Sequence, residues 1–265
     1  MTVGSMYGDG RYIARHPSVH SEDSDWKAHN LIPFIDEFAR LHAESEMRIL
    51  DVGGGAGRIL PTIVGHLRAR YGISPRQYAL DVSETLLCIQ RQHNPELLQL
   101  FHEDICDSRL EDKAVDLVLA IDVLEHTRNV YRALSTIGRI SRYAILKTPL
   151  ERNLYSAVYN ILKHGLPRRT AAESIGHLHF FSYSSLRRSV ERSCGRILRA
   201  NFSNVFAYYL SSPAHRGRLT RLDRHLSSVA RLVHRISPRA AATLCTDFLL
   251  LLIQCHPSKA SSRTE

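Results

Sequence analysis

Four glycines fall within five positions in the stretch RILDVGGGAGRIL at residues 48–60, directly after a short apolar segment. Their spacing is D-x-G-x-G-x-G, formed by Asp51, Gly53, Gly55 and Gly57. Glycine is the costliest residue to order, so this cluster indicates a bend where a ligand lies against bare backbone. Such a bend suits a dinucleotide or another ligand that contains adenosine. In the dinucleotide fingerprint, counted from Gly53, the third glycine would fall on Arg58, which disfavours a nicotinamide cofactor.

The glycine pattern resembles motif I of the class I S-adenosylmethionine-dependent methyltransferases, in particular those that act on small molecules of the ubiquinone and menaquinone type. Three later segments match this family in its own order. DVLEH at 122–126 is similar to the segment after the fourth strand, with Asp122 in place of the usual glutamate. LKTP at 146–149 is similar to the end of the fifth strand, and HLHFFSYSSL at 177–186 to the stretch before the last helix.

The resemblance implies S-adenosylmethionine as methyl donor, with its methionine end over the glycine bend. Asp81 corresponds to the family's acid on both ribose hydroxyls, and two vicinal donors match the two oxygens of one carboxylate. Asp104 and Ile105 correspond to an acid on the adenine amino group and an apolar contact on the ring. From the residues alone, Asp81 could instead stabilise a helix N-terminus, and Asp104 could belong to a solvated acidic loop. The expected cofactor-binding residues are Asp51, Gly53, Gly55, Gly57, Asp81, Val82, Asp104, Ile105 and Asp122.

Methyl transfer from a sulfonium needs an oriented acceptor and, for a hydroxyl, a group that accepts its proton. Histidine suits that step, so we expect His126 as the first candidate base and His177 as the second. A histidine that only caps its loop is the alternative for His126. In some relatives the residues corresponding to Asp122, Glu125 and His126 bind a divalent metal. Many relatives with this segment bind none, and we expect no metal here, with these three residues as the candidate ligands.

Apolar strands that alternate with amphipathic helices must position these residues. This alternation predicts a Rossmann-like α/β fold: a doubly wound, mostly parallel, seven-stranded sheet with helices on both faces and an antiparallel C-terminal strand. The site should then lie beyond the C-terminal ends of the strands. The predicted strands are 47–52, 77–82, 98–101, 115–121, 143–147, 196–200 and 246–254, and the predicted helices include one N-capped by Asn30 and those at 58–70, 129–140, 154–162 and 184–192.

The chain is expected to form one methyltransferase domain over residues 26–256. Its cofactor-binding core is predicted at 47–149 and its variable, acceptor-side part at 150–240. An irregular arm is predicted over residues 1–25 and a disordered tail over 257–265, because neither shows apolar periodicity.

Composition places the chain among ordinary globular proteins, with 265 residues, 44% of them hydrophobic and 23% charged. The formal charge of +9 permits phosphate-rich partners or an anionic membrane but does not require them. The five cysteines are odd in number and include no C-x-x-C pair, which disfavours a disulfide framework or a zinc site. With no apolar N-terminal segment to direct secretion, we expect a cytoplasmic protein.

A basic amphipathic helix is predicted near residues 218–236. Apolar residues recur there at spacings of three and four, with arginines largely on the other face. The helix could dock on an anionic membrane, pair with another subunit, or pack on the sheet as an extra helix or lid. The oligomeric state stays open.

The expected function is methyl transfer to a small organic acceptor at oxygen, with nitrogen and carbon as open alternatives. The acceptor itself stays open, because after Thr148 the chain enters the variable region of the family, where acceptor specificity normally resides. The loop KHGLPRRT at 163–170 could hold a phosphate or carboxylate, or be a solvated basic loop. Other candidate functions are RNA ribose methylation with a metal-assisted mechanism and a non-catalytic cofactor-binding scaffold. No RNA-binding module or aromatic-interleaved basic patch is visible, which disfavours nucleic acid.

Overall fold

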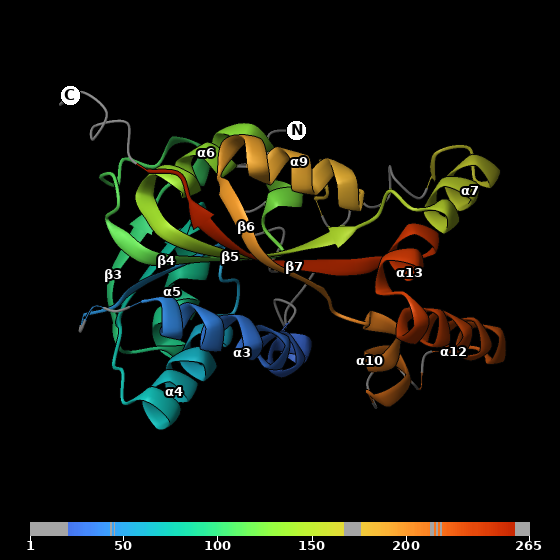
Figure 1. Cartoon of the computed structure of the whole chain (residues 1–265), viewed down its shortest axis with the longest axis horizontal. Helices are drawn as coiled ribbons and strands as arrows, with labels where there is room; N and C mark the ends of the chain where they lie inside the picture. The colour runs from blue at the N-terminus through green and yellow to red at the C-terminus, as the bar shows by residue number, and fades with distance from the viewer. Residues whose placement is uncertain are drawn as a thin grey trace.

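The structure is a computed structural model that contains one seven-stranded sheet (Figure 1). The strand order is β3-β2-β1-β4-β5-β7-β6. The pairs among β1 to β5 are parallel, and β7 runs antiparallel to both β5 and β6. This confirms the predicted fold and its antiparallel last strand. The strands are β1 Arg48–Val52, β2 Arg76–Asp81, β3 Leu97–His102, β4 Val115–Ile121, β5 Ser141–Leu150, β6 Gly195–Phe202 and β7 Asp247–Cys255. The structure describes residues 21–42, 44, 46–166, 176–212, 215, 217 and 219–257.

Helices cover both faces of the sheet, because alternate side chains of the central strands point to opposite sides. Ile49 and Leu117 pack with α3, α4 and α5 in one buried cluster, and Leu50 and Val118 pack with α6 and α9 in the other. Figure 1 shows these two groups of helices on either side of the sheet. The helices are η1 Ser21–Asp23, α3 Ser24–Leu41, α4 Ile59–Tyr71, α5 Glu84–His93, η2 Ile105–Asp107, η3 Leu124–His126, α6 Val130–Ile140, α7 Leu154–Leu162, α9 Tyr183–Ser193, α10 Val205–Ser211, α12 Arg221–Ile236 and α13 Pro238–Leu244.

The N-terminal arm predicted over residues 1–25 is wrong at its C-terminal end. Residues 21–25 are helical, because η1 runs directly into α3. The predicted N-cap, Asn30, lies inside α3, where its side-chain amide donates to the carbonyl of Trp26 over 2.8 Å. The rest of the predicted arm, residues 1–20, lies outside the described residues.

Contacts with distant segments account for the early start of α3. The Trp26 ring stacks on Tyr208 of α10 with 4.5 Å between centroids. Lys27 Nζ lies 3.0 Å from a carboxylate oxygen of Asp122, which follows β4. Neither contact is visible in the periodicity of the sequence, which reflects only the side chains that face the sheet.

The C-terminal part adds helices to the predicted set. α7 has its predicted bounds, whereas α10 and α13 were not predicted. The basic amphipathic helix is α12, which begins at Arg221. Residues 258–265 of the predicted tail, residue 218, and residues 167–170 of the basic loop lie outside the described residues. Among the described residues, no helix combines the length and the apolar composition needed to cross a membrane.

Gly138 allows α6 to lie directly on the backbone between α9 and β6. A Cβ at this position would lie 2.6 Å from the Cys194 carbonyl oxygen. Alanine normally stabilises a helix more than glycine does. Because of this overlap, we nevertheless expect Gly138→Ala to lower the free energy of unfolding by about 1–3 kcal/mol. At Gly65 in α4, an added Cβ would have no atom of a neighbouring element within 4 Å. Gly65→Ala should therefore raise the free energy of unfolding by about 0.5–1 kcal/mol. Urea denaturation of both variants checks the pair, and a stabilised Gly138→Ala would contradict the contact.

Candidate active site

Two adjoining cavities lie at the C-terminal edge of the parallel strands. The first has a volume of about 120 Å³ and the second about 410 Å³. Both are lined by Gly53, Gly55, Asp122 and His126, so the glycine loop forms part of the boundary between them. A ligand in the first cavity would therefore meet a ligand in the second at this loop.

The first cavity collects most of the residues expected to bind the cofactor. Its lining includes Gly53, Gly55, Asp81, Val82, Asp104, Ile105 and Asp122. Asp51 lines the second cavity instead, and Gly57 lines neither. These residues come from the ends of β1, β2, β3 and β4, which the parallel topology brings to one edge.

Two positions of the loop require glycine, each for a different structural reason. Gly53 has a φ of 63°, in the left-handed region, and a Cβ there would lie 2.9 Å from a Val123 methyl group. A side chain at this position would overlap Val123, so glycine is required where the backbone lines the cavity. Gly57 has a φ of 70°, and a Cβ there would lie 2.7 Å from Gln90 Cα in α5. Gly57 thus permits close packing of the loop on α5.

Asp81 is held at the end of β2 with its carboxylate fixed. The Ser83 backbone N–H donates to Oδ1 over 2.9 Å, and Gln90 Nε2 donates to Oδ2 over 3.3 Å. Burial raises the pKa of Asp81 to about 6, although the Ser83 hydrogen bond opposes the shift. Burial and the nearby Asp81 charge raise the pKa of Asp51 to about 7. A ligand that donates hydrogen bonds to Asp81 would favour its ionised form.

Asp122 is held by two ammonium groups. Lys147 Nζ lies 2.6 and 2.8 Å from its two carboxylate oxygens, and Lys27 Nζ lies 3.0 Å from one of them. Burial acts to raise the pKa of Asp122, but the two lysines lower it to about 2. Its φ of 57° is uncommon outside glycine, and such backbone strain clusters at functional sites. Lys147 itself is fully buried, with Nζ 3.4 Å from the centroid of the Phe248 ring.

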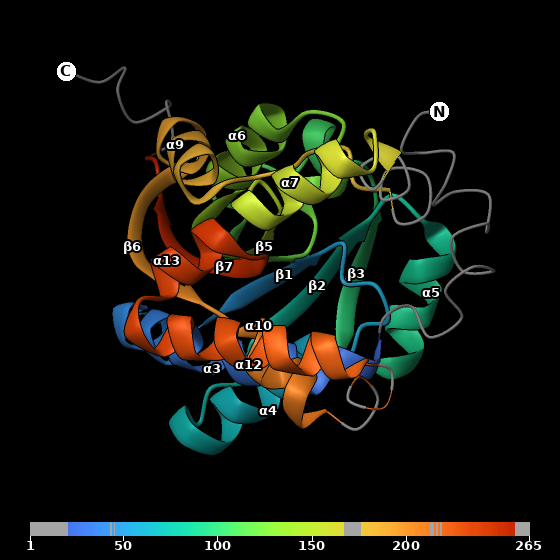
Figure 2. The same cartoon turned by 90° about the vertical axis from the view of Figure 1, so that its right-hand side faces the viewer.

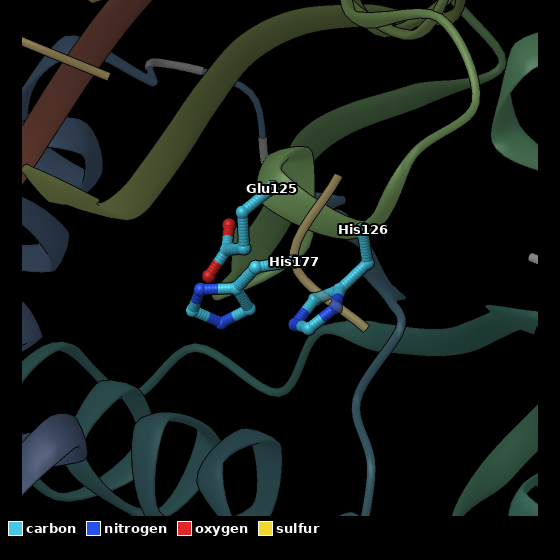
Figure 3. A group of neighbouring side chains, drawn as sticks. All are labelled: Glu125, His126 and His177. Atoms are coloured by element: carbon cyan, nitrogen blue, oxygen red, sulfur yellow. The ribbon is translucent and has the colours of Figure 1, made fainter. Parts of the chain in front are cut away.

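Glu125, His126 and His177 meet in the second cavity, where Figure 3 shows the Glu125 carboxylate facing the His177 ring and His126 beside it. The imidazole centroids are 4.9 Å apart. The donor atoms of the three side chains lie within 4.8 Å of one another, a spacing that could hold a metal ion. The predicted candidate ligands included Asp122, but here its carboxylate is held by the two lysines and His177 lies in the group instead.

Hydrogen bonds fix the tautomer of each histidine. His177 Nδ1 lies 2.8 Å from Glu151 Oε2, and His126 Nδ1 lies 3.1 Å from the Gly176 carbonyl oxygen. A carboxylate or a carbonyl only accepts, so each neutral ring has its proton on Nδ1 and its lone pair on Nε2. Both rings therefore have the tautomer of a base that accepts a proton at Nε2.

The segment that carries His177 is pinned beside η3. The backbone N–H groups of Leu178 and His179 both donate to the Glu125 carbonyl, over 2.8 and 3.1 Å. The His179 ring donates to the Thr127 carbonyl over 2.7 Å, so it supports this segment while His177 lines the second cavity. The order of the motifs in the sequence does not reveal this arrangement.

Sequence reasoning missed three charged residues of the site. Glu151 follows β5 directly and holds His177. Lys147 lies inside the LKTP segment, and Lys27 lies at the start of α3. A lysine within an otherwise buried strand was the available indication for Lys147, because a buried charge requires a partner. No local pattern marks the other two.

Sequence comparison identifies the type of domain. Residues 26–193 match the family described as "Methyltransferase domain". Among curated protein sequences, none matches at a significant level.

Solved structures share the fold at low sequence identity. The protein bound to the Haloferax volcanii Trm112 methyltransferase activator is 18% identical, with a TM-score of 0.56, over 96% of this chain and 98% of that one. Geranyl diphosphate C-methyltransferase from Streptomyces coelicolor A3(2), in complex with Mg²⁺ and S-adenosyl-L-homocysteine, is 10% identical, with a TM-score of 0.57, over 87% and 75%. Haemonchus contortus phosphoethanolamine N-methyltransferase 2 is 11% identical, with a TM-score of 0.57, over 86% and 53%. The domain match covers more than half of the chain, and the protein therefore belongs to the class I S-adenosylmethionine-dependent methyltransferases.

Proposed function

We propose that the protein methylates a hydroxyl group of a small organic acceptor, in the cytoplasm, with a histidine of the second cavity as base. One observation carries the proposal: the cavity beside the glycine loop holds two imidazoles whose tautomers leave Nε2 able to accept a proton. The reacting methyl group and the base would then meet at the boundary of the two cavities. In this proposal the first cavity takes the methyl donor and the second takes the acceptor.

The linings of the two cavities support this division. The ribose diol of the donor would bind Asp81, and the adenine would lie against Val82 and Ile105 with its amino group on Asp104. The methionine end would lie over Gly53 and Gly55, which line both cavities and have no side chains of their own. The bound donor supplies a methyl group already activated by its sulfonium. The protein mainly has to orient the acceptor and remove its proton.

His177 is the first choice as base in this arrangement. As the acceptor oxygen attacks the methyl carbon, the C–S bond breaks, the O–C bond forms, and the hydroxyl proton moves to Nε2 of the ring. The Glu151 carboxylate, 2.8 Å from Nδ1, stabilises the imidazolium that results. His126, whose ring lies against His177, is the second candidate.

A metal-assisted transfer, including one to an RNA ribose, is the second candidate. It is favoured by the donor atoms of Glu125, His126 and His177, and by Glu125 Oε2, which is buried and has no hydrogen-bond partner among the described residues. The lysines occupy Asp122, so Glu125 is the one carboxylate in the group of three, a poorer set than hard divalent cations prefer. We therefore propose the metal-independent route.

The test is methyl transfer from labelled S-adenosylmethionine to fractions of a cell extract. We expect label in a small molecule, as a methyl ether, with activity unchanged after dialysis against EDTA. Labelled RNA, or activity lost with EDTA and restored by Mg²⁺ or Mn²⁺, would support the metal-assisted candidate instead. No calorimetric affinity for S-adenosylmethionine or S-adenosylhomocysteine would overturn the assignment of the first cavity. Cofactor affinity without transfer to any fraction would support a non-catalytic scaffold.

A further inference from the structure

The basic amphipathic helix α12 does not turn its apolar side to the protein. Ser227 and Ala230 are its buried residues, so its small side chains form the packed face. The apolar stripe of the helix is exposed, with Leu222 at 66% and Ile236 at 80%. An amphipathic helix usually buries that stripe. The exposed stripe consists of Leu222, Leu226, Val229, Leu232 and Ile236.

Helix α7 adds a second exposed apolar surface at the same end of the molecule. It has no buried residue, and Ile161 and Leu162 are 73% and 69% exposed. Figures 1 and 2 both show α7 and α12 at this end, with α13 between them, and α13 packs on both. We call this surface the α7–α12 face: it consists of the α12 stripe, Leu244 of α13, and Leu154, Tyr155, Val158, Tyr159, Ile161 and Leu162 of α7.

The charged residues next to the α7–α12 face are almost all basic. Four arginines of α12 lie beside its apolar stripe, and Lys163 follows α7. Asp223, the one acid of α12, accepts hydrogen bonds from the backbone N–H and the hydroxyl of Thr220 in a capping box. None of the four arginines pairs with a carboxylate in the part of the chain that the structure describes. They are Arg221, Arg224, Arg231 and Arg235.

We propose that the α7–α12 face docks on an anionic phospholipid surface. Exposed leucine, isoleucine and valine side chains can enter the outer part of the acyl-chain region, and arginines can contact lipid phosphates. Tyrosines favour the interface between the acyl chains and the headgroups. Tyr155 and Tyr159, stacked with 5.8 Å between ring centroids, supply such aromatic side chains. A second copy of the chain is the poorer occupant, because it would oppose one arginine-rich face to another. The inference depends on this surface and not on the acceptor proposed above.

The position of the face links it to the second cavity. Asn153, the N-cap of α7, donates to Thr246 Oγ1 over 3.1 Å, and Thr246 lines that cavity. Glu151 of the same cavity lies two residues before this cap. Docking would therefore place the acceptor cavity close to the lipid surface, where an acceptor dissolved in the membrane can reach it.

Vesicle co-sedimentation of the full chain tests the proposal. We expect binding to vesicles of phosphatidylcholine with phosphatidylglycerol, little binding to pure phosphatidylcholine, and weaker binding as salt rises. Leu226→Asp should weaken binding by more than about tenfold, since it removes an inserting side chain and adds a repelled charge. Arg224→Gln should weaken it by about fivefold, the effect expected of one basic residue near the surface. Leu98→Asp, at an exposed apolar position of the edge strand β3, is the matched control and should change nothing.

Two measurements keep the outcome decisive. Circular dichroism shows that each variant is folded, which we expect because the substituted side chains are exposed. Light scattering after size exclusion reports the oligomeric state of the wild type and of Leu226→Asp. No binding to the anionic vesicles, or binding that Leu226→Asp leaves unchanged, would overturn the proposal. A stable dimer that Leu226→Asp dissociates would overturn it too, by assigning the face to a second copy.

Discussion

Replacing Asp81 by asparagine should weaken binding of S-adenosylmethionine and S-adenosylhomocysteine by about 100-fold, because each hydrogen bond to a charged group contributes about 1.5–3 kcal/mol. The substitution keeps the shape of the side chain and an acceptor for the Ser83 N–H, which now lies 2.9 Å from Oδ1. It removes the charge and one of the two oxygens that would accept from the ribose diol. Isothermal titration calorimetry measures both ligands directly.

The same carboxylate should make cofactor binding depend on pH. Burial raises the pKa of Asp81 to about 6, and only the ionised form offers an unprotonated, charged oxygen to each hydroxyl of a diol. Above that pH the group is already ionised, so affinity should be flat with respect to Asp81. Below it, a proton must leave before the ligand binds, so affinity should fall by up to about tenfold per pH unit.

Two comparisons make the pH prediction specific. The dependence due to Asp81 should vanish in Asp81→Asn. A dependence that persists would arise from Asp51, whose pKa burial and the Asp81 charge raise to about 7 and which should titrate at lower pH once that charge is removed. Asp25→Asn, on the exposed side of α3, is the control and should bind like the wild type. Equal affinity of wild type and Asp81→Asn across pH 5 to 8 would contradict the placement of the ribose on Asp81.

The bounds of an element are predicted best from the sequence where the element packs within the sheet along its whole length. β4 has its predicted bounds, because a strand buried on both faces is apolar at every position. Boundaries set by one distant contact were missed. α3 begins early because Trp26 stacks on Tyr208 and Lys27 pairs with Asp122, and neither contact leaves a periodic trace.

In the candidate site too, the residues at strand ends were predicted, and those placed by distant contacts were missed. The order of the motifs brought Asp81, Asp104 and His126 to one edge, because parallel strands end at the same edge of a sheet. Glu151 could not be found, because its role depends on where the segment after Gly176 folds back. The periodicity near 218–236 identified the apolar side of a helix, but not which side would meet the protein. In the structure the small residues meet it, and the apolar side is exposed.

Replacing His177 by alanine should lower kcat by about 10²–10⁴-fold, the usual contribution of general base catalysis, while affinity for S-adenosylmethionine stays near that of the wild type. We expect the rate to change without the cofactor affinity because His177 lines the second cavity and not the first. Single-turnover transfer of label measures the rate and calorimetry the affinity. His29→Ala, at an exposed position of α3, is the matched control. Loss of turnover in His126→Ala with full activity in His177→Ala would assign the base to His126.

The Glu151→Gln variant distinguishes two roles for His177: a base that Glu151 orients, or a side chain that only supports the fold. Glutamine can still accept from Nδ1, where the present distance is 2.8 Å, so the ring should keep its tautomer. The charge that stabilises the imidazolium formed during transfer is lost, so single-turnover transfer should slow while the affinity for S-adenosylmethionine stays near that of the wild type. Glu151→Asp keeps the charge and should retain more activity than Glu151→Gln. Equal rates in Glu151→Gln and Glu151→Asp would mean that the dyad is structural, because a hydrogen bond that only supports the fold does not depend on the charge of residue 151.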